Sequence, residues 1–124
     1  MVRHIVAWKL LDSTQLHGDK SEASINAKAL LEGLKTKVPS LERAEVWRDA
    51  DPDTVFFMKM LDEEQQCMLK SVINEDTGLF DLCLYSEFAN WNGLEAYVDH
   101  PDHKFVAKFI GEIRADRGCV DYEV

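Results

Sequence analysis

The sequence predicts an α+β domain in which four strands form one antiparallel sheet and helices cover one of its faces. Four segments have the alternation or apolar content of strands, and four segments between them, one of which lies in the insert, repeat apolar residues at helical spacing. The elements follow one another as strand, helix, strand, insert, strand, helix, helix, strand. Two halves of the β-α-β kind are typical of a ferredoxin-like sheet.

The first predicted strand covers residues 2–11 and alternates between two largely apolar faces. One face carries Val2, His4, Val6, Trp8 and Leu10. A polar connector over residues 12–20 leads to a helix over residues 20–37, whose apolar residues recur every three or four positions. Asp19 and Glu22 resemble a capping box at the start of this helix.

The middle of the chain contains a second strand over residues 41–49 and an insert over residues 54–78. Within the insert, the apolar run at residues 55–58 predicts either a strand or a buried loop. Helical spacing follows over residues 61–72, where Asp62 can cap a helix. The apolar residues of the insert either form a lid over a ligand or pack the insert itself.

The last third of the chain begins with a strand over residues 79–88. Asn90 can cap a short helix through Asp99, and Pro101 suits the first turn of the next helix. We expect His100 to cap that helix. A final strand is predicted over residues 118–124.

A four-stranded sheet of this kind leaves its second face uncovered. The apolar side chains expected there are Ile5, Ala7, Leu11, Cys83 and Tyr85, or the opposite set if the faces are reversed. Pairing with a second copy would bury either set. We therefore expect a homodimer.

The length and net charge of the chain indicate one domain and argue against two classes of binding partner. A chain of 124 residues is expected to form one domain, residues 1–124, and its net charge of −9 argues against binding to nucleic acid or an anionic membrane. No apolar run is long enough to span a bilayer, and the N-terminus reads directly into a strand, so a cytoplasmic location is expected. Cys67, Cys83 and Cys119 form neither a disulfide nor a zinc pattern, and the last two are expected to be buried apolar groups.

Four motifs in register resemble the stress-responsive α/β-barrel domain family, Dabb. They are RHIVAWKL at residues 3–10, DLCLYSEF at 81–88, LEAYVDHPDH at 94–103 and VDYEV at 120–124. The resemblance covers nearly the whole chain and implies a dimeric α+β barrel. Most members of the family have no established activity, and many are named for stress-induced expression.

The resemblance also implies candidate site residues. A few members are cofactor-free polyketide cyclases, whose catalytic histidine and tyrosine correspond here to His103 and Tyr97. The strand histidine that lines their pocket corresponds to His4. The insert is longer than the family's usual connector, and we expect it to border the region where ligands enter.

The periodicity independently directs these side chains toward one apolar layer. His103 shares a helix face with Val106 and Ile110, and His4 shares a strand face with Trp8. Trp8, Val106 and Ile110 are therefore candidates, with His4, to contact a small apolar or aromatic ligand. In an enzyme, a neutral His103 could remove a proton next to a carbonyl while the Tyr97 hydroxyl stabilises the enolate.

Three interpretations of function remain open. The first is a homodimeric small-molecule-binding domain, and the second is a cofactor-free cyclase or lyase that uses His103 and Tyr97. The third is a cofactor-independent monooxygenase of the same superfamily. We expect no metal or cofactor, because Pro101 breaks the helical geometry that would bring His100 and His103 together and no third ligand is evident.

Overall fold

The computed structural model describes all 124 residues, and its centre is one antiparallel sheet with the strand order β2-β3-β1-β4. The strands are β1 (Val2–Leu10), β2 (Arg43–Ala50), β3 (Phe80–Phe88) and β4 (Arg114–Glu123). This strand order, with helices between β1 and β2 and between β3 and β4, is that of a ferredoxin-like α+β fold, as predicted. The last strand begins four residues earlier than the sequence indicated, directly at the end of the preceding helix.

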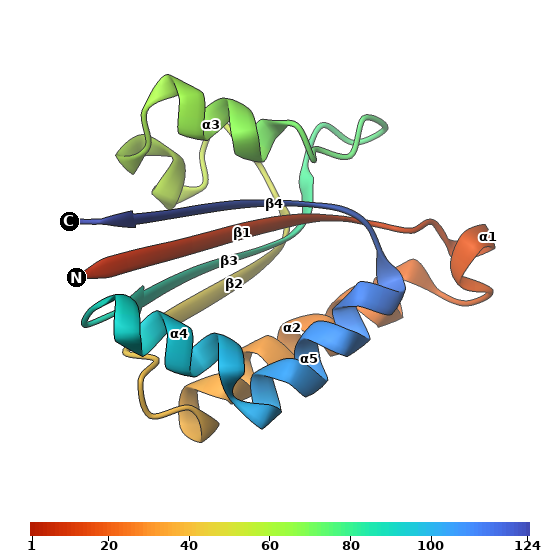
Figure 1. Cartoon of the computed structure of the whole chain (residues 1–124). Coiled ribbons are helices and arrows are strands. Elements are labelled where there is room, and N and C mark those ends of the chain that lie inside the picture. The colour runs from red at the N-terminus through yellow and green to blue at the C-terminus, as the bar shows by residue number, and fades with distance from the viewer.

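Three helices cover one face of the sheet (Figure 1): α2 (Lys20–Lys37), α4 (Trp91–Asp99) and α5 (Pro101–Ile113). Together with the strand residues that face them they form a core of 19 buried residues. In β1 this face consists of the predicted set, and Val2, Val6 and Leu10 are at most 2% exposed. None of the helices combines the length and hydrophobicity that crossing a membrane requires.

Local hydrogen bonds explain where the helices begin. The Asp19 carboxylate accepts from the backbone N–H of Ser21, so Asp19 caps α2 without completing the expected box with Glu22. A complete capping box instead joins Asp12 and Gln15, which begin a short helix, α1 (Ser13–Leu16), in the segment predicted as a connector. The sequence prediction missed α1 because a single turn buries no residue and has no apolar periodicity.

The insert between β2 and β3 lies on the opposite face of the sheet (Figure 1). It forms the 3₁₀ helix η1 (Phe56–Met60) and the helix α3 (Glu63–Lys70), which begins at Asp62 as predicted. Phe57 and Leu69 are fully buried there, in a second core of 13 buried residues. The apolar residues of the insert therefore pack it against the sheet.

The expectation that the second face of the sheet is uncovered is wrong. Ile5, Ala7, Cys83 and Tyr85 point to this face and are at most 1% exposed within the single chain. The insert covers this face with η1 and α3, whose apolar side chains pack against the strands. Helices consequently lie on both faces of the sheet.

A buried carboxylate anchors the far end of the insert. Asp81 is 3% exposed and accepts hydrogen bonds from the backbone N–H of Leu10 (2.8 Å) and the side-chain amide of Asn74 (3.0 Å). The ammonium of Lys20, at the start of α2, lies 3.1 Å from Oδ2, the oxygen that also accepts from Leu10. Because each partner comes from a different element, Asp81 joins β1, α2 and the insert at one point.

The burial of α3 predicts the effect of two neighbouring substitutions. Leu69 is fully buried and Met68 is 50% exposed. We expect Leu69→Ala to lower the free energy of unfolding by about 2–5 kcal/mol, because it leaves a cavity between α3 and the sheet. Met68→Ala should change it by no more than about 0.5 kcal/mol. Urea unfolding measures both, and equal effects would show that α3 does not pack on the sheet.

Candidate functional site

A cavity of about 220 Å³ lies between the sheet and the helices on the α2–α4–α5 side. Its lining is His4, Val6, Trp8, Leu31, Leu84, Tyr97, His103, Ala107, Ile110, Gly111, Arg114 and Arg117. Five of the six sequence-predicted site residues are in this set. The exception is Val106, which is buried among the core residues and does not line the cavity.

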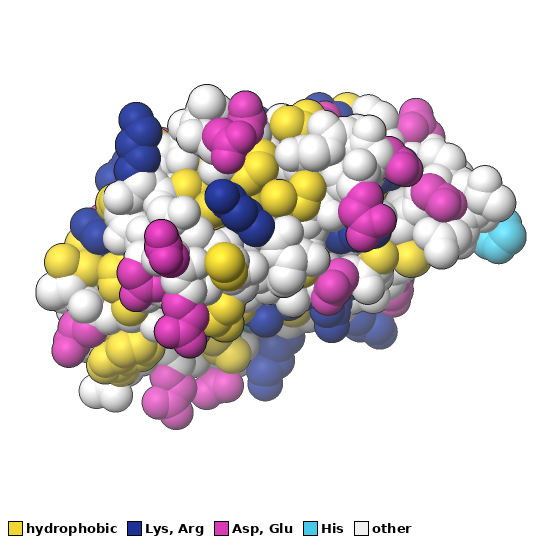
Figure 2. Space-filling view, turned by 90° about the horizontal axis from the view of Figure 1, so that it is seen from above, with side chains coloured by type: hydrophobic (Ala, Val, Ile, Leu, Met, Phe, Trp, Pro, Cys, Tyr) yellow, Lys and Arg dark blue, Asp and Glu magenta, His cyan; other side chains and the backbone are white.

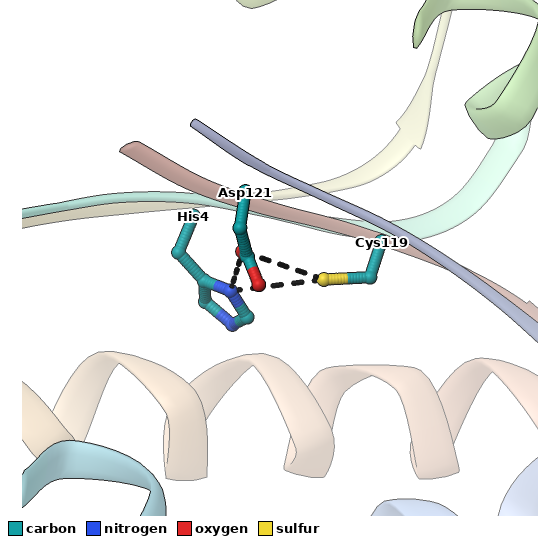
Figure 3. Close-up of side chains that lie close together, drawn as sticks. All are labelled: His4, Cys119 and Asp121. Atoms are coloured by element: carbon teal, nitrogen blue, oxygen red, sulfur yellow. Dashed lines mark hydrogen bonds and ion pairs between the residues drawn. The ribbon is translucent and has the colours of Figure 1, made fainter. Parts of the chain in front are cut away.

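His4, which lines the cavity, forms a hydrogen-bonded pair with Asp121. The register between β1 and β4 places the two residues directly opposite each other, and both side chains point from the sheet toward the helices (Figure 3). Nδ1 of His4 contacts Oδ1 of Asp121. A carboxylate accepts hydrogen bonds, so in the neutral ring the proton is on Nδ1 and Nε2 has a free lone pair.

The pKa of Asp121 reflects this pairing. Burial raises the pKa of the carboxyl group, but the hydrogen bond from His4 and the nearby positive charges outweigh burial. The pKa of Asp121 is therefore below its ordinary value, and the carboxylate remains ionised beside the imidazole.

Cys119 lies next to the pair on β4 (Figure 3). Its Sγ is 3.7 Å from Nδ1 of His4 and 3.5 Å from Oδ1 of Asp121. Burial, together with the charge of Asp121, raises the pKa of the thiol to about 11, so at neutral pH it is protonated and a poor nucleophile. Cys119 is also only partly buried, in contrast to the sequence prediction.

The donor atoms of the same three side chains lie within 4.8 Å of one another, as the ligands of a metal ion would. Two ligands of one tetrahedral zinc ion, with bonds of about 2.0–2.3 Å, lie roughly 3.3–3.8 Å apart. The contact between Nδ1 of His4 and Oδ1 of Asp121 is closer than that and has the geometry of a hydrogen bond. In the structure the imidazole and the carboxylate are hydrogen-bonded to each other, with a thiol beside them.

Tyr97 comes from α4 and its ring packs near both site histidines. The ring centroids are 6.1 Å apart for His4 and Tyr97 and 4.4 Å apart for Tyr97 and His103. Burial raises the pKa of the Tyr97 phenol, so the hydroxyl keeps its proton at neutral pH. This hydroxyl has no hydrogen-bond partner within the protein and is available to donate to a bound molecule.

His103 lies in the first turns of α5 and is half-buried. Its Nδ1 is 3.2 Å from the carbonyl oxygen of Val98, which can only accept, so Nδ1 carries the proton and Nε2 has a free lone pair. Burial lowers the pKa of His103, partly opposed by this hydrogen bond. The ring is therefore neutral near pH 7.

His100 has the structural role that the sequence predicted. Its Nδ1 accepts from the backbone N–H of Asp102, 3.1 Å away, and caps α5. His100 does not line the cavity, so the turn at Pro101 separates it from His103.

The sequence prediction missed Asp121, Cys119, Arg114 and Arg117 and misplaced the insert. Asp121 and Cys119 become neighbours of His4 only through the pairing of β1 with β4, the first and last strands of the chain. Alternation within 118–124 does place Cys119 and Asp121 on one strand face, which is the one available signal. The insert does not border the cavity, because the sheet lies between them (Figure 1).

The fold and the cavity define a ferredoxin-like α+β domain with a small site between sheet and helices. Residues 63–124, half of the chain, match the sequence profile of the Stress responsive A/B Barrel Domain, Dabb. The chain belongs to the Dabb family, as its motifs indicated.

Solved structures with the same fold include a dimeric protein of unknown function from Bacteroides fragilis. It is 25% identical, with a TM-score of 0.68, and the match covers 99% of this chain and 95% of that one. A Dabb family protein from Mesorhizobium loti is 19% identical, with a TM-score of 0.58 over 99% of this chain and 95% of that one. The hydroxynitrile lyase of Passiflora edulis is 16% identical, with a TM-score of 0.60 over 99% and 92% of the respective chains. No curated protein sequence matches the chain.

The environment of His103 predicts a pH dependence of stability. Its pKa in the folded protein is below the ordinary value of 6.5, so the unfolded chain binds the proton more readily. The corresponding stability is fully present above about pH 6.5 and is lost as the pH falls through the folded pKa. His103→Gln should weaken this loss between about pH 7.5 and pH 5.5, as measured by urea unfolding at several pH values. An unchanged dependence on pH would contradict the account of His103.

Proposed function

We propose that this Dabb protein binds a small organic molecule in the cavity between the sheet and α2, α4 and α5. The observation that carries the proposal is the convergence of His4, Tyr97 and His103, from three different elements, on one largely apolar cavity. Few polar groups in an apolar wall are typical of small-molecule sites. The apolar part of the ligand would contact Trp8 and Ile110.

We further propose that the protein is a homodimer. The dimeric relative from Bacteroides fragilis, whose structure covers nearly the whole chain, supports this proposal. A dimer contact on the second face would have to involve the outer surface of the insert, because the insert covers the sheet there. Figure 2 views the molecule from that side and shows hydrophobic side chains among charged ones. A cytoplasmic location remains a prediction from the sequence.

A thermal-shift screen of small metabolites tests the binding site. A ligand present at about 100 times its Kd should stabilise the protein by about 2.7 kcal/mol and raise its melting temperature by several degrees. In the variant His103→Ala the same ligand should give a smaller shift, because one wall of the cavity is lost.

A matched control is His17→Asn, which removes a histidine that follows α1 and does not line the cavity. His17 has a positive φ of 54°, a conformation that asparagine tolerates. The control should keep the full ligand response. Loss of the response in both variants, or in neither, would contradict binding at His103.

A second candidate function is cofactor-free acid–base catalysis, and the pairing of His4 with Asp121 favours it. An imidazole whose Nδ1–H is held by an ionised carboxylate has a fixed tautomer, and the carboxylate stabilises the imidazolium that forms when Nε2 accepts a proton. His103 has a free Nε2 as well, but its Nδ1–H is held by a neutral carbonyl. His4 is therefore the stronger candidate for the base.

The chemistry that these groups support is proton abstraction next to a carbonyl. Nε2 of the base takes the proton, and the electrons of the C–H bond form an enolate whose oxygen accepts a hydrogen bond from Tyr97. In an aldol closure the enolate carbon then attacks a second carbonyl, and the oxygen of that carbonyl takes up the proton. The reaction is a cyclase step when the carbon–carbon bond forms, and a lyase step when the reverse reaction breaks such a bond.

Proton exchange in D₂O tests this second function directly. We expect the protein to accelerate deuterium incorporation at the activated carbon of a β-keto acid, followed by proton NMR. His4→Gln should slow the exchange by about 10²–10⁴-fold, and Asp121→Asn should also slow it because the tautomer of His4 is no longer held. Equal exchange with wild type and both variants would contradict a catalytic role for the pair.

A further inference from the structure

The residues that line the cavity include two arginines and no acidic residue, although the chain as a whole is acidic; the Asp121 carboxylate beside the cavity is hydrogen-bonded to His4. The sequence contains 23 acidic and 14 basic residues, yet none of the 12 residues that line the cavity is acidic. Two of them are arginines, Arg114 and Arg117, at the start of β4. A local excess of positive charge in a chain with a net charge of −9 points to a ligand that carries negative charge.

Arg117 is placed close to the polar groups of the site. It lies opposite Trp8 in the β1–β4 register and alternates onto the same face of β4 as Cys119 and Asp121. For Tyr97, its positive charge opposes part of the rise in pKa that burial causes. For Asp121, it adds to the lowering of the pKa that the hydrogen bond from His4 causes. The guanidinium thus acts on the hydroxyl of Tyr97, which lines the cavity, and on the carboxylate of Asp121, which is paired with His4.

Neither arginine lies within ion-pair distance of a carboxylate in the protein. None of the ion pairs of the chain includes Arg114 or Arg117. Arg43 provides the contrast, since its guanidinium lies between Glu45 and Glu87 on the other side of the molecule. Both guanidinium groups are therefore free to form a direct ion pair with a ligand.

We propose that the ligand of this cavity is a small carboxylate, bound through Arg117 and supported by Arg114. This inference rests on the proposed small-molecule site and specifies its ligand class. A guanidinium donates two parallel hydrogen bonds to a carboxylate, and such charge-assisted bonds are short and directional. Seven of the 12 lining residues are hydrophobic, so the body that bears the carboxylate is apolar or aromatic. An inorganic anion would leave this apolar wall without a partner.

Matched pairs of probes separate charge from shape. We would titrate the protein with benzoate against benzamide, phenylacetate against phenylacetamide and hexanoate against hexanamide, by calorimetry. For at least one pair, the carboxylate should bind about tenfold or more tightly than its amide. Arg117→Gln should remove this preference, while Arg117→Lys should keep part of it because the charge remains.

The control substitution is Lys108→Gln, which removes one positive charge from the exposed side of α5, outside the cavity. It should leave the preference for the carboxylate unchanged. If Lys108→Gln and Arg117→Gln reduce the preference equally, the effect comes from net charge and the proposal is overturned. Equal binding of every carboxylate and its amide, or no binding of any carboxylate, would also overturn it.

The imidazole NMR signals of His4 and His103 distinguish this proposal from the one on which it rests. If uncharged amides move these signals as strongly as carboxylates do, the cavity binds small molecules but does not select carboxylates. If no probe moves them, the carboxylate proposal fails together with binding of such molecules at the cavity. Signals that move only with carboxylates, and no longer in Arg117→Gln, support both proposals.

Discussion

The central strands β1 and β3 are buried on both faces, and the rest of the molecule is organised around that burial. Val6 and Ile5 are neighbours in sequence, but each is at most 1% exposed, in cores on opposite sides of the sheet. One core depends on α2, α4 and α5, and the other depends on the insert. Because one chain supplies both layers, the sheet separates the side that contains the cavity from the side that the insert packs against.

The chemistry of the site depends on where the sheet brings the ends of the chain together. His4 is near the N-terminus and Asp121 is near the C-terminus, and the β1–β4 register makes them partners. Tyr97 and His103 reach the same cavity from the opposite layer. Burial keeps Tyr97 protonated and His103 neutral, so the cavity presents a hydrogen-bond donor beside two free imidazole nitrogens.

Periodicity and local motifs were sufficient to predict most of the secondary structure and part of the site. The apolar stripe of α2, the cap at Asp62 and the break at Pro101 are local properties, and all of them hold in the structure. The position of the insert is not local: helical spacing shows that α3 has a buried side but not which surface it covers. Asp121 was missed for the same reason, because its role arises from pairing between strands more than a hundred residues apart in sequence.

The proposed function places ligand binding on one face of the sheet and only packing on the other, and solution NMR tests this difference most directly. Backbone and imidazole signals would be followed while a ligand found by the thermal-shift screen is titrated into the labelled protein. We predict shifts centred on His4, Tyr97 and His103, with signals of α3 unaffected at saturation. Shifts centred on α3, with the signals of the cavity unchanged, would contradict the account.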